Sequence, residues 1–407
     1  MRYGNGVVRP RGRIAVGAIG LFACAMLLAG CTGSSGSSGA SGGSGAAAAT
    51  STTVANPMKI SVSPAADIQS NPNQPIVVSA TQGTLTKVVV TNPSTGNTVA
   101  GQFNADKTSW TSSDQLRFAA SYQVDATGTS KLGQATEQKA TVNTLKPAAT
   151  LYPNMVPAPS TASVGVGQII AIKFDKPVTD KAAVEKNLQV ISTPAQTGGW
   201  SWISSSEVHY RPKVYWQAGS TVEVKINLFG VNLGNNYYGE ANRDVTYHIH
   251  DSWVAKADGN SEQMQIFHNG ALVNTMPISM GKDATPTHTG PHVISFKQNP
   301  YVMNSCTYGV CSGPQAYVAT EYWAERISND GEFVHENPNS VAAQGNTNVS
   351  HGCINLNEQN AQWFFNTFNI GDVVEVTNSG GGPLPIYDTW GDWELSWSQW
   401  QAGSALS

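Results

Sequence analysis

The chain contains 407 residues with a formal net charge of −4, and only 12% of its residues are charged. This length predicts more than one domain. Beyond the N-terminal arginines no basic cluster remains, so we expect no nucleic-acid partner.

Residues 1–30 have the pattern of an export signal. Four arginines precede an apolar stretch, Ile14 to Leu28, that is short for a membrane span. The run Leu28-Ala29-Gly30-Cys31 is typical of a lipobox and makes Cys31 the predicted lipidation site. An ordinary signal peptide and a transmembrane anchor are the alternatives. We expect the mature protein to be lipid-anchored at the extracytoplasmic face of the cell membrane, in the cell wall or periplasmic space.

Residues 31–56 contain a low-complexity segment behind this cysteine. From Thr32 to Thr53 the chain consists of Ser, Gly, Ala and Thr, a composition that cannot bury a core. Roughly 20 such residues have a root-mean-square reach of about 25 Å. The segment is therefore predicted to be a tether that holds a folded body away from a lipid surface.

Two segments, residues 57–146 and 147–251, have the pattern of small antiparallel β-sandwiches. Short alternating runs are separated by turn signals, and Trp110 and Tyr122 are interpreted as core aromatics. The expected strands are Lys59–Ser63, Thr86–Val90, Gly101–Phe103, Arg117–Phe118, Tyr122–Ala126, Ala140–Val142, Gln168–Phe174, Glu207–Tyr210 and Thr221–Ile226. The first segment contains no catalytic constellation. In the second, His248 and His250 share one face of the last strand, and with no third ligand nearby we interpret them as an edge pair and not as a metal site.

Residues 252–378 form a third predicted unit. Two alternating runs flank Asn269-Gly270, a pair that favours the type I′ turn of a β-hairpin. The stretch from Asn357 to Phe368 predicts a helix that its first residue caps and that Gly371 ends. The unit is therefore mostly β with one helix.

The segment from Phe333 to Asn355 carries the chemistry. It places Cys353 18 residues after His335 and two residues after His351. A nucleophilic thiol needs an imidazole or another positive group to hold it as thiolate, and the longer separation suits a base on one strand facing a nucleophile at the end of the following loop. The N–H groups of Gly352 and Cys353 are candidates to stabilise an oxyanion. These are the parts of an acyl-transfer site.

A zinc site built from His335, His351 and Cys353 is the alternative, because all three side chains are zinc ligands. No carboxylate or further histidine lies beside them at a short ligand spacing. We therefore rank the acyl-transfer site first and expect neither a metal nor another cofactor.

The remaining cysteines of the exported chain are also informative. Cys306 and Cys311 form a C-x4-C pair, which in an oxidising compartment is typical of a local disulfide. Apart from Cys31, this leaves Cys353 as the unpaired thiol, and such a thiol is a liability unless it is used.

The run Ser350-His351-Gly352-Cys353-Ile354-Asn355, preceded by Phe333-Val334-His335, resembles the signature of the L,D-transpeptidase catalytic domain, which cross-links bacterial peptidoglycan through a cysteine acyl-enzyme. The order of segments is also similar to that of mycobacterial-type members. The resemblance implies a mainly β protein with two immunoglobulin-like β-sandwiches, followed by a β catalytic domain with one helix near the nucleophile.

The resemblance also implies roles for individual residues. Cys353 is the expected nucleophile, His335 the general base, and the backbone carbonyl of Glu336, where relatives have serine, orients the imidazole. The segment from Tyr301 to Tyr322 is expected to be a lid over the acyl site. Residues expected to shape the site or to bind substrate are Met303, Tyr308, Tyr317, Ser350, His351 and Asn355.

The implied substrates are peptidoglycan stem peptides. Cys353 is expected to release the terminal D-Ala of a tetrapeptide and to pass the acyl group to a neighbouring stem, giving a 3→3 cross-link. Acylation by carbapenems is a further expectation. An L,D-carboxypeptidase with water as acceptor and a non-catalytic lipoprotein that binds the cell wall are the alternatives.

Residues 379–407 form a tryptophan-rich tail. Trp390, Trp393, Trp397 and Trp400 are spaced by 3, 4 and 3 residues, which fits one helical face. We expect the tail to dock near the junction of the second sandwich with the catalytic domain. A sugar-stacking platform is the alternative.

Overall fold

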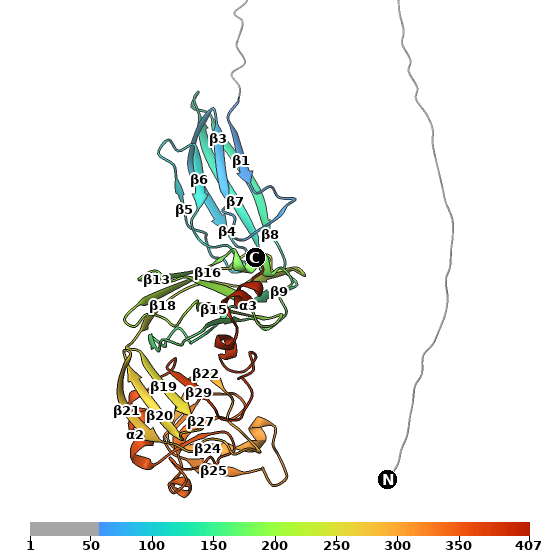
Figure 1. The fold of residues 1–407 in the computed structure, drawn as a ribbon. Helices are drawn as coiled ribbons and strands as arrows, with labels where there is room; N and C mark the ends of the chain where they lie inside the picture. Colours follow the sequence, from blue (N-terminus) through green and yellow to red (C-terminus); the bar gives the residue numbers. More distant parts are fainter. Residues whose placement is uncertain (1–56) are drawn as a thin grey trace, which may run out of the picture. The chain divides into compact units, whose positions relative to one another are not determined.

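The computed structural model describes residues 57–407 (Figure 1). The predicted signal, the lipidation site Cys31 and the tether lie outside the described residues. Within residues 57–407, no helix is both long enough and apolar enough to span a membrane. The expected fold class is confirmed, because the described chain is mainly β with a few short helices.

The first sandwich contains two four-stranded sheets, ordered β1-β3-β6-β5 and β2-β8-β7-β4. Alternate residues of β7, including Tyr122, are buried together with Trp110, so the predicted core aromatics are confirmed. The strand expected at Arg117–Phe118 is wrong. The chain turns there, and the Arg117 N–H donates to the Tyr122 hydroxyl at 2.8 Å, as in the tyrosine corner of immunoglobulin-like folds. The strands are β1 (Lys59–Ser63), β2 (Gln69–Ser70), β3 (Val77–Thr81), β4 (Gly83–Thr91), β5 (Gly101–Phe103), β6 (Ser109–Ser112), β7 (Ser121–Ser130) and β8 (Ala135–Thr144).

The second sandwich also pairs two four-stranded sheets, ordered β10-β12-β15-β14 and β11-β18-β16-β13, with the small sheet β17-β9 beside them. Asp180 caps its short helix by accepting from the Ala183 N–H. Its elements are β9 (Ala149–Leu151), β10 (Asn154–Val156), β11 (Ser163–Val164), β12 (Ile170–Lys173), α1 (Lys181–Glu185), β13 (Leu188–Thr193), β14 (Gly198–Trp202), β15 (Glu207–Pro212), β16 (Thr221–Asn227), β17 (Tyr237–Gly239) and β18 (Asn242–Ile249).

The third unit combines a five-stranded sheet, β21-β20-β19-β29-β22, with a four-stranded sheet, β23-β26-β27-β28, and a separate hairpin, β24-β25. The predicted Asn269-Gly270 turn is confirmed, since both residues have positive φ and His268 pairs with Ala271. Its elements are β19 (Trp253–Asp258), β20 (Gln263–His268), β21 (Ala271–Pro277), β22 (Gly290–Val293), β23 (Phe296–Gln298), β24 (Tyr301–Asn304), η1 (Ser305–Tyr308), β25 (Val318–Glu321), β26 (Ala324–Arg326), β27 (Phe333–Glu336), η2 (Pro338–Ser340), β28 (Ile354–Leu356), α2 (Glu358–Thr367) and β29 (Val373–Thr377).

Helix α2 follows the nucleophile strand, as predicted. Asn357 caps it by accepting from the Asn360 N–H, and Ala361, Phe364 and Phe368 bury one face in the core of the third unit. Gly371 does not end the helix. The helix ends because Phe368 takes an extended conformation, and the Lys297 ammonium donates to the carbonyl of Phe368, in the way that cations satisfy helix C-termini.

The tail does not form the single helix that its tryptophan spacing suggested. Trp390 has a left-handed φ of 61°, η3 (Gly391–Glu394) follows it, and Ser396 starts a separate helix, α3 (Trp397–Ala402), with a capping box. Because η3 and α3 begin separately, the four tryptophans do not share the face of one continuous helix.

The tail nevertheless packs on the body, as expected. The indole N–H groups of Trp393 and Trp400 donate to the carbonyls of Gly167 and Gly199, each at 2.9 Å. The Arg211 guanidinium lies 4.8 Å from each of these two rings. The indoles are thus used in packing on the second sandwich.

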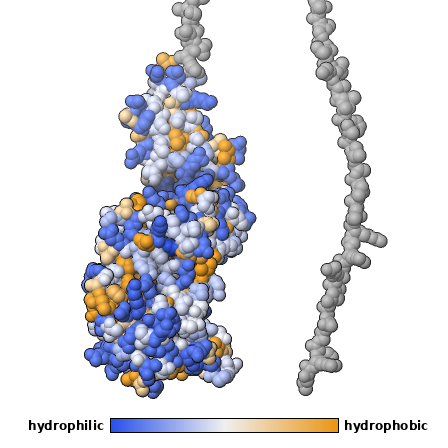
Figure 2. All heavy atoms as spheres, viewed as in Figure 1, coloured by the Kyte–Doolittle hydropathy of each residue, from blue (hydrophilic) through white to orange (hydrophobic). Residues whose placement is uncertain are grey.

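The surface is mostly hydrophilic. Figure 2 shows apolar residues gathered in small separate patches on the face in view. Exposed apolar side chains include Leu272 and Val273 on strand β21 and Val318 and Tyr322 at the hairpin β24-β25. Scattered exposure of this kind is normal for a folded protein in water.

Candidate active site

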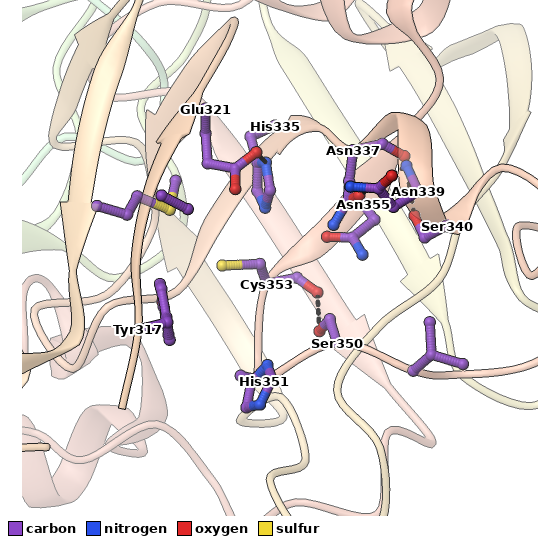
Figure 3. Close-up of a pocket in the computed structure, with 13 residues that line it drawn as sticks. Tyr317, Glu321, His335, Asn337, Asn339, Ser340, Ser350, His351, Cys353 and Asn355 are labelled. Atoms are coloured by element: carbon purple, nitrogen blue, oxygen red, sulfur yellow. Dashed lines mark hydrogen bonds and ion pairs between the residues drawn. The ribbon is translucent and has the colours of Figure 1, made fainter. Parts of the chain in front are cut away.

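Strand pairing brings the cysteine and the histidine together. Strands β27 and β28 are parallel, and His335 pairs with Asn355. Cys353 directly precedes β28 and lies two residues before Asn355, so both side chains point to the same side of the sheet. Figure 3 shows His335, Cys353 and Asn355 around one cavity. A base on one strand therefore faces a nucleophile at the end of the following loop.

The imidazole of His335 is held from behind by the main chain. Its Nδ1 lies 2.6 Å from the backbone oxygen of Glu336. A carbonyl oxygen only accepts hydrogen bonds, so Nδ1 carries the proton and Nε2 is left for the thiol. The interaction uses the carbonyl, and the exchange of serine for glutamate at this position leaves it intact.

A second acceptor on this nitrogen was missed in the sequence. Glu321 Oε2 lies 3.3 Å from His335 Nδ1. Burial by itself lowers the pKa of His335, whereas its hydrogen bond to Cys353 and the charges of Cys353 and Glu321 raise that pKa to about 10. The imidazole is therefore cationic at neutral pH, which is the state that stabilises a neighbouring thiolate.

The loop before the cysteine is held by Ser350. Its hydroxyl donates to the Cys353 carbonyl at 2.6 Å and accepts from the Gly352 N–H at 3.0 Å. Gly352 has a φ of 127°, which favours glycine, and a Cβ there would also meet the Glu332 side chain at 3.4 Å. Because Ser350 already occupies the Gly352 N–H, the expectation of a free oxyanion donor at Gly352 is not met.

The Cys353 N–H is the other predicted donor. Among the described residues it has no hydrogen-bond partner, and Cys353 is 6% exposed. Its sulfur lies 3.5 Å from the carbonyl oxygen of Gly331. The N–H that remains available beside the sulfur therefore belongs to the nucleophile itself.

His351 lies at the exposed edge of the cavity and not beside the catalytic imidazole of His335. Its Nε2 lies 3.3 Å from the Lys282 ammonium, and its ring lies 5.7 Å from that of Tyr317. Burial and the positive charge of Lys282 lower the pKa of His351. A neutral imidazole at this wall can hydrogen-bond a substrate.

Residues 301–322, hereafter the flap, contribute one face of a hairpin to the cavity. Tyr317, Ala319 and Glu321 alternate along the chain and line the cavity, together with Met303, which pairs with Ala319. The residues between them, including Val318, point away and are exposed. Strand periodicity therefore decides which flap residues reach the site.

Tyr308 departs from the expectation. It does not line the cavity but packs behind it, with its ring 6.3 Å from that of Phe333 and against Gly331. Cys306 and Cys311 are joined by a disulfide in the same part of the flap. These residues support the flap from outside the cavity.

The cavity has a volume of about 320 Å³. Asn355 places a buried side-chain oxygen there that has no hydrogen-bond partner within residues 57–407. An unpaired buried acceptor of this kind is satisfied by a ligand or water. The lining residues are Met303, Tyr317, Ala319, Glu321, His335, Asn337, Asn339, Ser340, Val349, Ser350, His351, Cys353 and Asn355.

The alternative zinc site receives no support from the arrangement. Within residues 57–407, no group of three or more His, Cys, Asp or Glu side chains is placed to hold a metal ion. His335, His351 and Cys353 all border the cavity, yet they do not converge on one point.

The fold and the site define a cysteine-dependent acyl-transfer enzyme whose catalytic domain follows two immunoglobulin-like sandwiches in the chain. The L,D-transpeptidase catalytic domain matches residues 252–376, and a bacterial Ig domain matches residues 67–232, across both sandwiches. L,D-transpeptidase 2 of Mycobacterium tuberculosis is 40% identical over 81% of this chain and 81% of its own length. The chain belongs to the L,D-transpeptidase family and is an L,D-transpeptidase.

The chain is also similar to two further proteins. L,D-transpeptidase 5 of M. tuberculosis is 34% identical over 84% of this chain and 75% of its own length. The structure of the LD transpeptidase LdtMt1 in complex with imipenem is 32% identical, covers 55% of this chain and 99% of the solved chain, and has a TM-score of 0.48.

Proposed function

We propose that this protein forms 3→3 peptidoglycan cross-links through a thioester on Cys353. The observation that carries the proposal is the placement of the buried thiol beside an imidazole whose Nδ1 bonds the Glu336 carbonyl at 2.6 Å. The donor is a stem tetrapeptide whose third residue is of the meso-diaminopimelate type. Its cleavable amide joins that residue to the terminal D-Ala.

The first half-reaction is acylation. The Cys353 thiolate attacks the carbonyl carbon of the amide, and a carbon–sulfur bond forms as the carbon–nitrogen bond breaks. The His335 imidazolium gives its proton to the departing D-Ala amine. The Cys353 N–H is the donor we assign to the oxyanion, because the Gly352 N–H is held by Ser350.

The second half-reaction is transfer to the acceptor. The side-chain amine of a neighbouring stem attacks the thioester carbonyl, His335 takes the proton, and the thiolate leaves. We assign Met303, Tyr317, His351 and Asn355 to substrate binding because they line the cavity. We assign Ser350 to shaping the loop because its hydroxyl accepts from the Gly352 N–H and donates to the Cys353 carbonyl. Tyr308 supports the flap.

The setting of the reaction follows from the family and from the N-terminal sequence. Peptidoglycan lies outside the cytoplasmic membrane, so the enzyme acts extracytoplasmically. We propose that Cys31 carries the lipid anchor and that residues 31–56 are the tether. Globomycin-sensitive processing, or its loss in Cys31→Ala, tests the anchor.

Two measurements test the reaction. A disaccharide-tetrapeptide substrate should yield cross-linked dimer, whereas tripeptide as the dominant product would identify an L,D-carboxypeptidase. Incubation with a carbapenem should add one drug mass to the intact protein and none to Cys353→Ala. An unmodified wild type, or an adduct on the variant, would contradict the assignment of the nucleophile.

A further inference from the structure

The flap brings a carboxylate to the catalytic base. Glu321 is the last residue of β25 and pairs with Tyr301 of β24. It shares the cavity face with Tyr317 and Ala319, whereas the intervening Val318 is 69% exposed. A one-residue change of register would turn Glu321 to solvent. The hairpin register therefore determines whether the carboxylate reaches the site.

The contact joins two side chains that water barely reaches. Glu321 Oε2 lies 3.3 Å from His335 Nδ1, and the side chains of Glu321 and His335 are 19% and 4% exposed. Figure 3 shows the Glu321 carboxylate directed at the His335 ring from the side opposite Asn337 and Asn339. Two charges that are largely kept from water interact more strongly than an ion pair on the surface, because water screens them less.

We propose that Glu321 is a positioning residue of the transpeptidase reaction, a carboxylate carried by the flap that keeps His335 charged and aligned while the flap lies over the site. The carbonyl of Glu336 fixes the direction of the ring, and the Glu321 carboxylate places a negative charge beside the same ring nitrogen, Nδ1. This proposal rests on the roles proposed above for Cys353 and His335.

The end of the flap that carries Glu321 is tied to the strand of the base. His335 and Cys353 belong to β27 and the loop before β28, whereas Glu321 belongs to a separate two-stranded sheet. The Glu336 N–H donates to the carbonyl of Tyr322, the residue after Glu321, at 3.0 Å. The Glu321 carboxylate and the Glu336 carbonyl therefore reach His335 from two segments that are hydrogen-bonded to each other.

Other charged groups around His335 must be separated from this effect. Cys353 faces the ring from the nucleophile loop, and Tyr317 faces the thiol from the flap. Glu336 is adjacent in β27, and burial together with the charges of Glu358, at the start of α2, and Glu321 raises the pKa of its carboxyl. Glu358 is exposed, takes no part in the site, and so offers a matched acidic control.

The test compares Glu321→Gln, Glu321→Asp and Glu358→Gln across the neutral and alkaline range. The measurement is kcat/KM for D-alanine release, which reports acylation with either acceptor. Loss of the carboxylate should move the alkaline limb of the Glu321→Gln profile to lower pH by about one unit or more, because a nearby opposite charge shifts a pKa by that amount. Glu321→Asp should recover part of the shift, and Glu358→Gln should match the wild type.

An alkaline limb in Glu321→Gln that coincides with those of the wild type and Glu358→Gln would overturn the proposal. Circular dichroism and thermal unfolding of each variant report whether it folds, and Asp at the same position preserves the charge should Gln unfold the flap. Including His335→Gln separates the two failures. If that variant is inactive while Glu321→Gln is unshifted, only the role of Glu321 is lost; an active His335→Gln overturns the proposed site itself.

Discussion

His335 and His209 are both buried and both lie beside carboxylates, but they serve different purposes. His335 lies in the catalytic cavity, and His209 lies on β15 against the tail. The Nε2 of His209 is 2.6 Å from Glu207 and its Nδ1 is 2.7 Å from Asp392. Burial lowers the pKa of His209, but the charges of Asp392 and Glu207 raise it to about 9. Both imidazoles are therefore cationic at neutral pH.

The difference lies in the second ring nitrogen. Both nitrogens of His209 are occupied by carboxylates, so it links β15 to η3 and has no nitrogen free for chemistry. At His335 the carbonyl of Glu336 and the carboxylate of Glu321 share Nδ1, which leaves Nε2 for a thiol. A raised pKa therefore does not identify a base; an unoccupied nitrogen beside a nucleophile does.

The largest expected effect is on activity. His335→Gln should lower kcat/KM by about 10²- to 10⁴-fold, since it removes the general base and the charge that stabilises the thiolate. The same substitution at His209 is the matched control and should retain activity wherever the variant is folded. Steady-state D-alanine release measures both. Comparable losses in the two variants would erase the distinction drawn here.

The free energy of unfolding should show the reverse order, with a larger loss in His209→Gln than in His335→Gln. His209→Gln leaves the buried Asp392 carboxylate without its cation, and breaking a buried ion pair costs about 3–5 kcal/mol. Chemical unfolding should therefore give a lower midpoint for His209→Gln than for the wild type, and Asp392→Asn should behave similarly. A midpoint equal to that of the wild type would show that the tail contact contributes nothing.

The pH dependence of stability sharpens the comparison. The folded-state pKa of His209, about 9, exceeds its ordinary value of 6.5. Its stabilisation is thus complete below about pH 6.5 and is lost as pH rises through about 9; a shift of this size corresponds to about 3 kcal/mol. His335 titrates in an overlapping range, so the difference between wild type and His209→Gln isolates His209. Parallel profiles would contradict the assignment.

The smallest effect is expected from the flap disulfide. Replacing Cys306 and Cys311 by serine opens a short loop, for which chain entropy contributes about 2 kcal/mol. The folded-state change should be local to the flap that carries Glu321. Limited proteolysis should cut residues 305–317 faster in the double variant, and the global unfolding midpoint should fall by less than it does for His209→Gln. Equal cleavage rates would show that the hairpin alone orders the flap.

Local sequence signals predicted the parts of the site that lie close together in the chain. Spacing and residue type indicated Cys353 and His335, and the family resemblance supplied the role of the Glu336 carbonyl; two adjacent strands and a short motif hold all three. Glu321 was missed because residues 301–322 were interpreted as an irregular lid. Once Tyr317 is placed at the cavity, a two-residue strand period also brings Ala319 and Glu321 to it.

Other predictions failed where a single backbone angle or side chain decides. The tryptophan spacing fits a helix, but a periodicity cannot register that Trp390 takes a left-handed φ of 61° and starts a new element. The Gly352 N–H was expected to stabilise the oxyanion, but it donates to the hydroxyl of Ser350, which lies three residues before the nucleophile. Contacts of this kind follow from the folded loop and not from residue type.

The docked tail adds an attachment between the catalytic domain and the second sandwich, which also meet directly where the Gly165 and Gly167 N–H groups donate to the carbonyls of Ile370 and Gly371, each at 2.8 Å. The chain enters the domain after β18, and its last residues return to the sandwich. There Glu185 accepts from the Ala405 N–H and the Ser404 hydroxyl, both at 2.6 Å. Contacts at several separate points keep the two bodies from swivelling about the single chain connection after β18. Extensions fused behind Ser407 would lie beside the tail contact, so affinity tags and fluorescent reporters are better inserted in the tether, behind the proposed lipidation site Cys31.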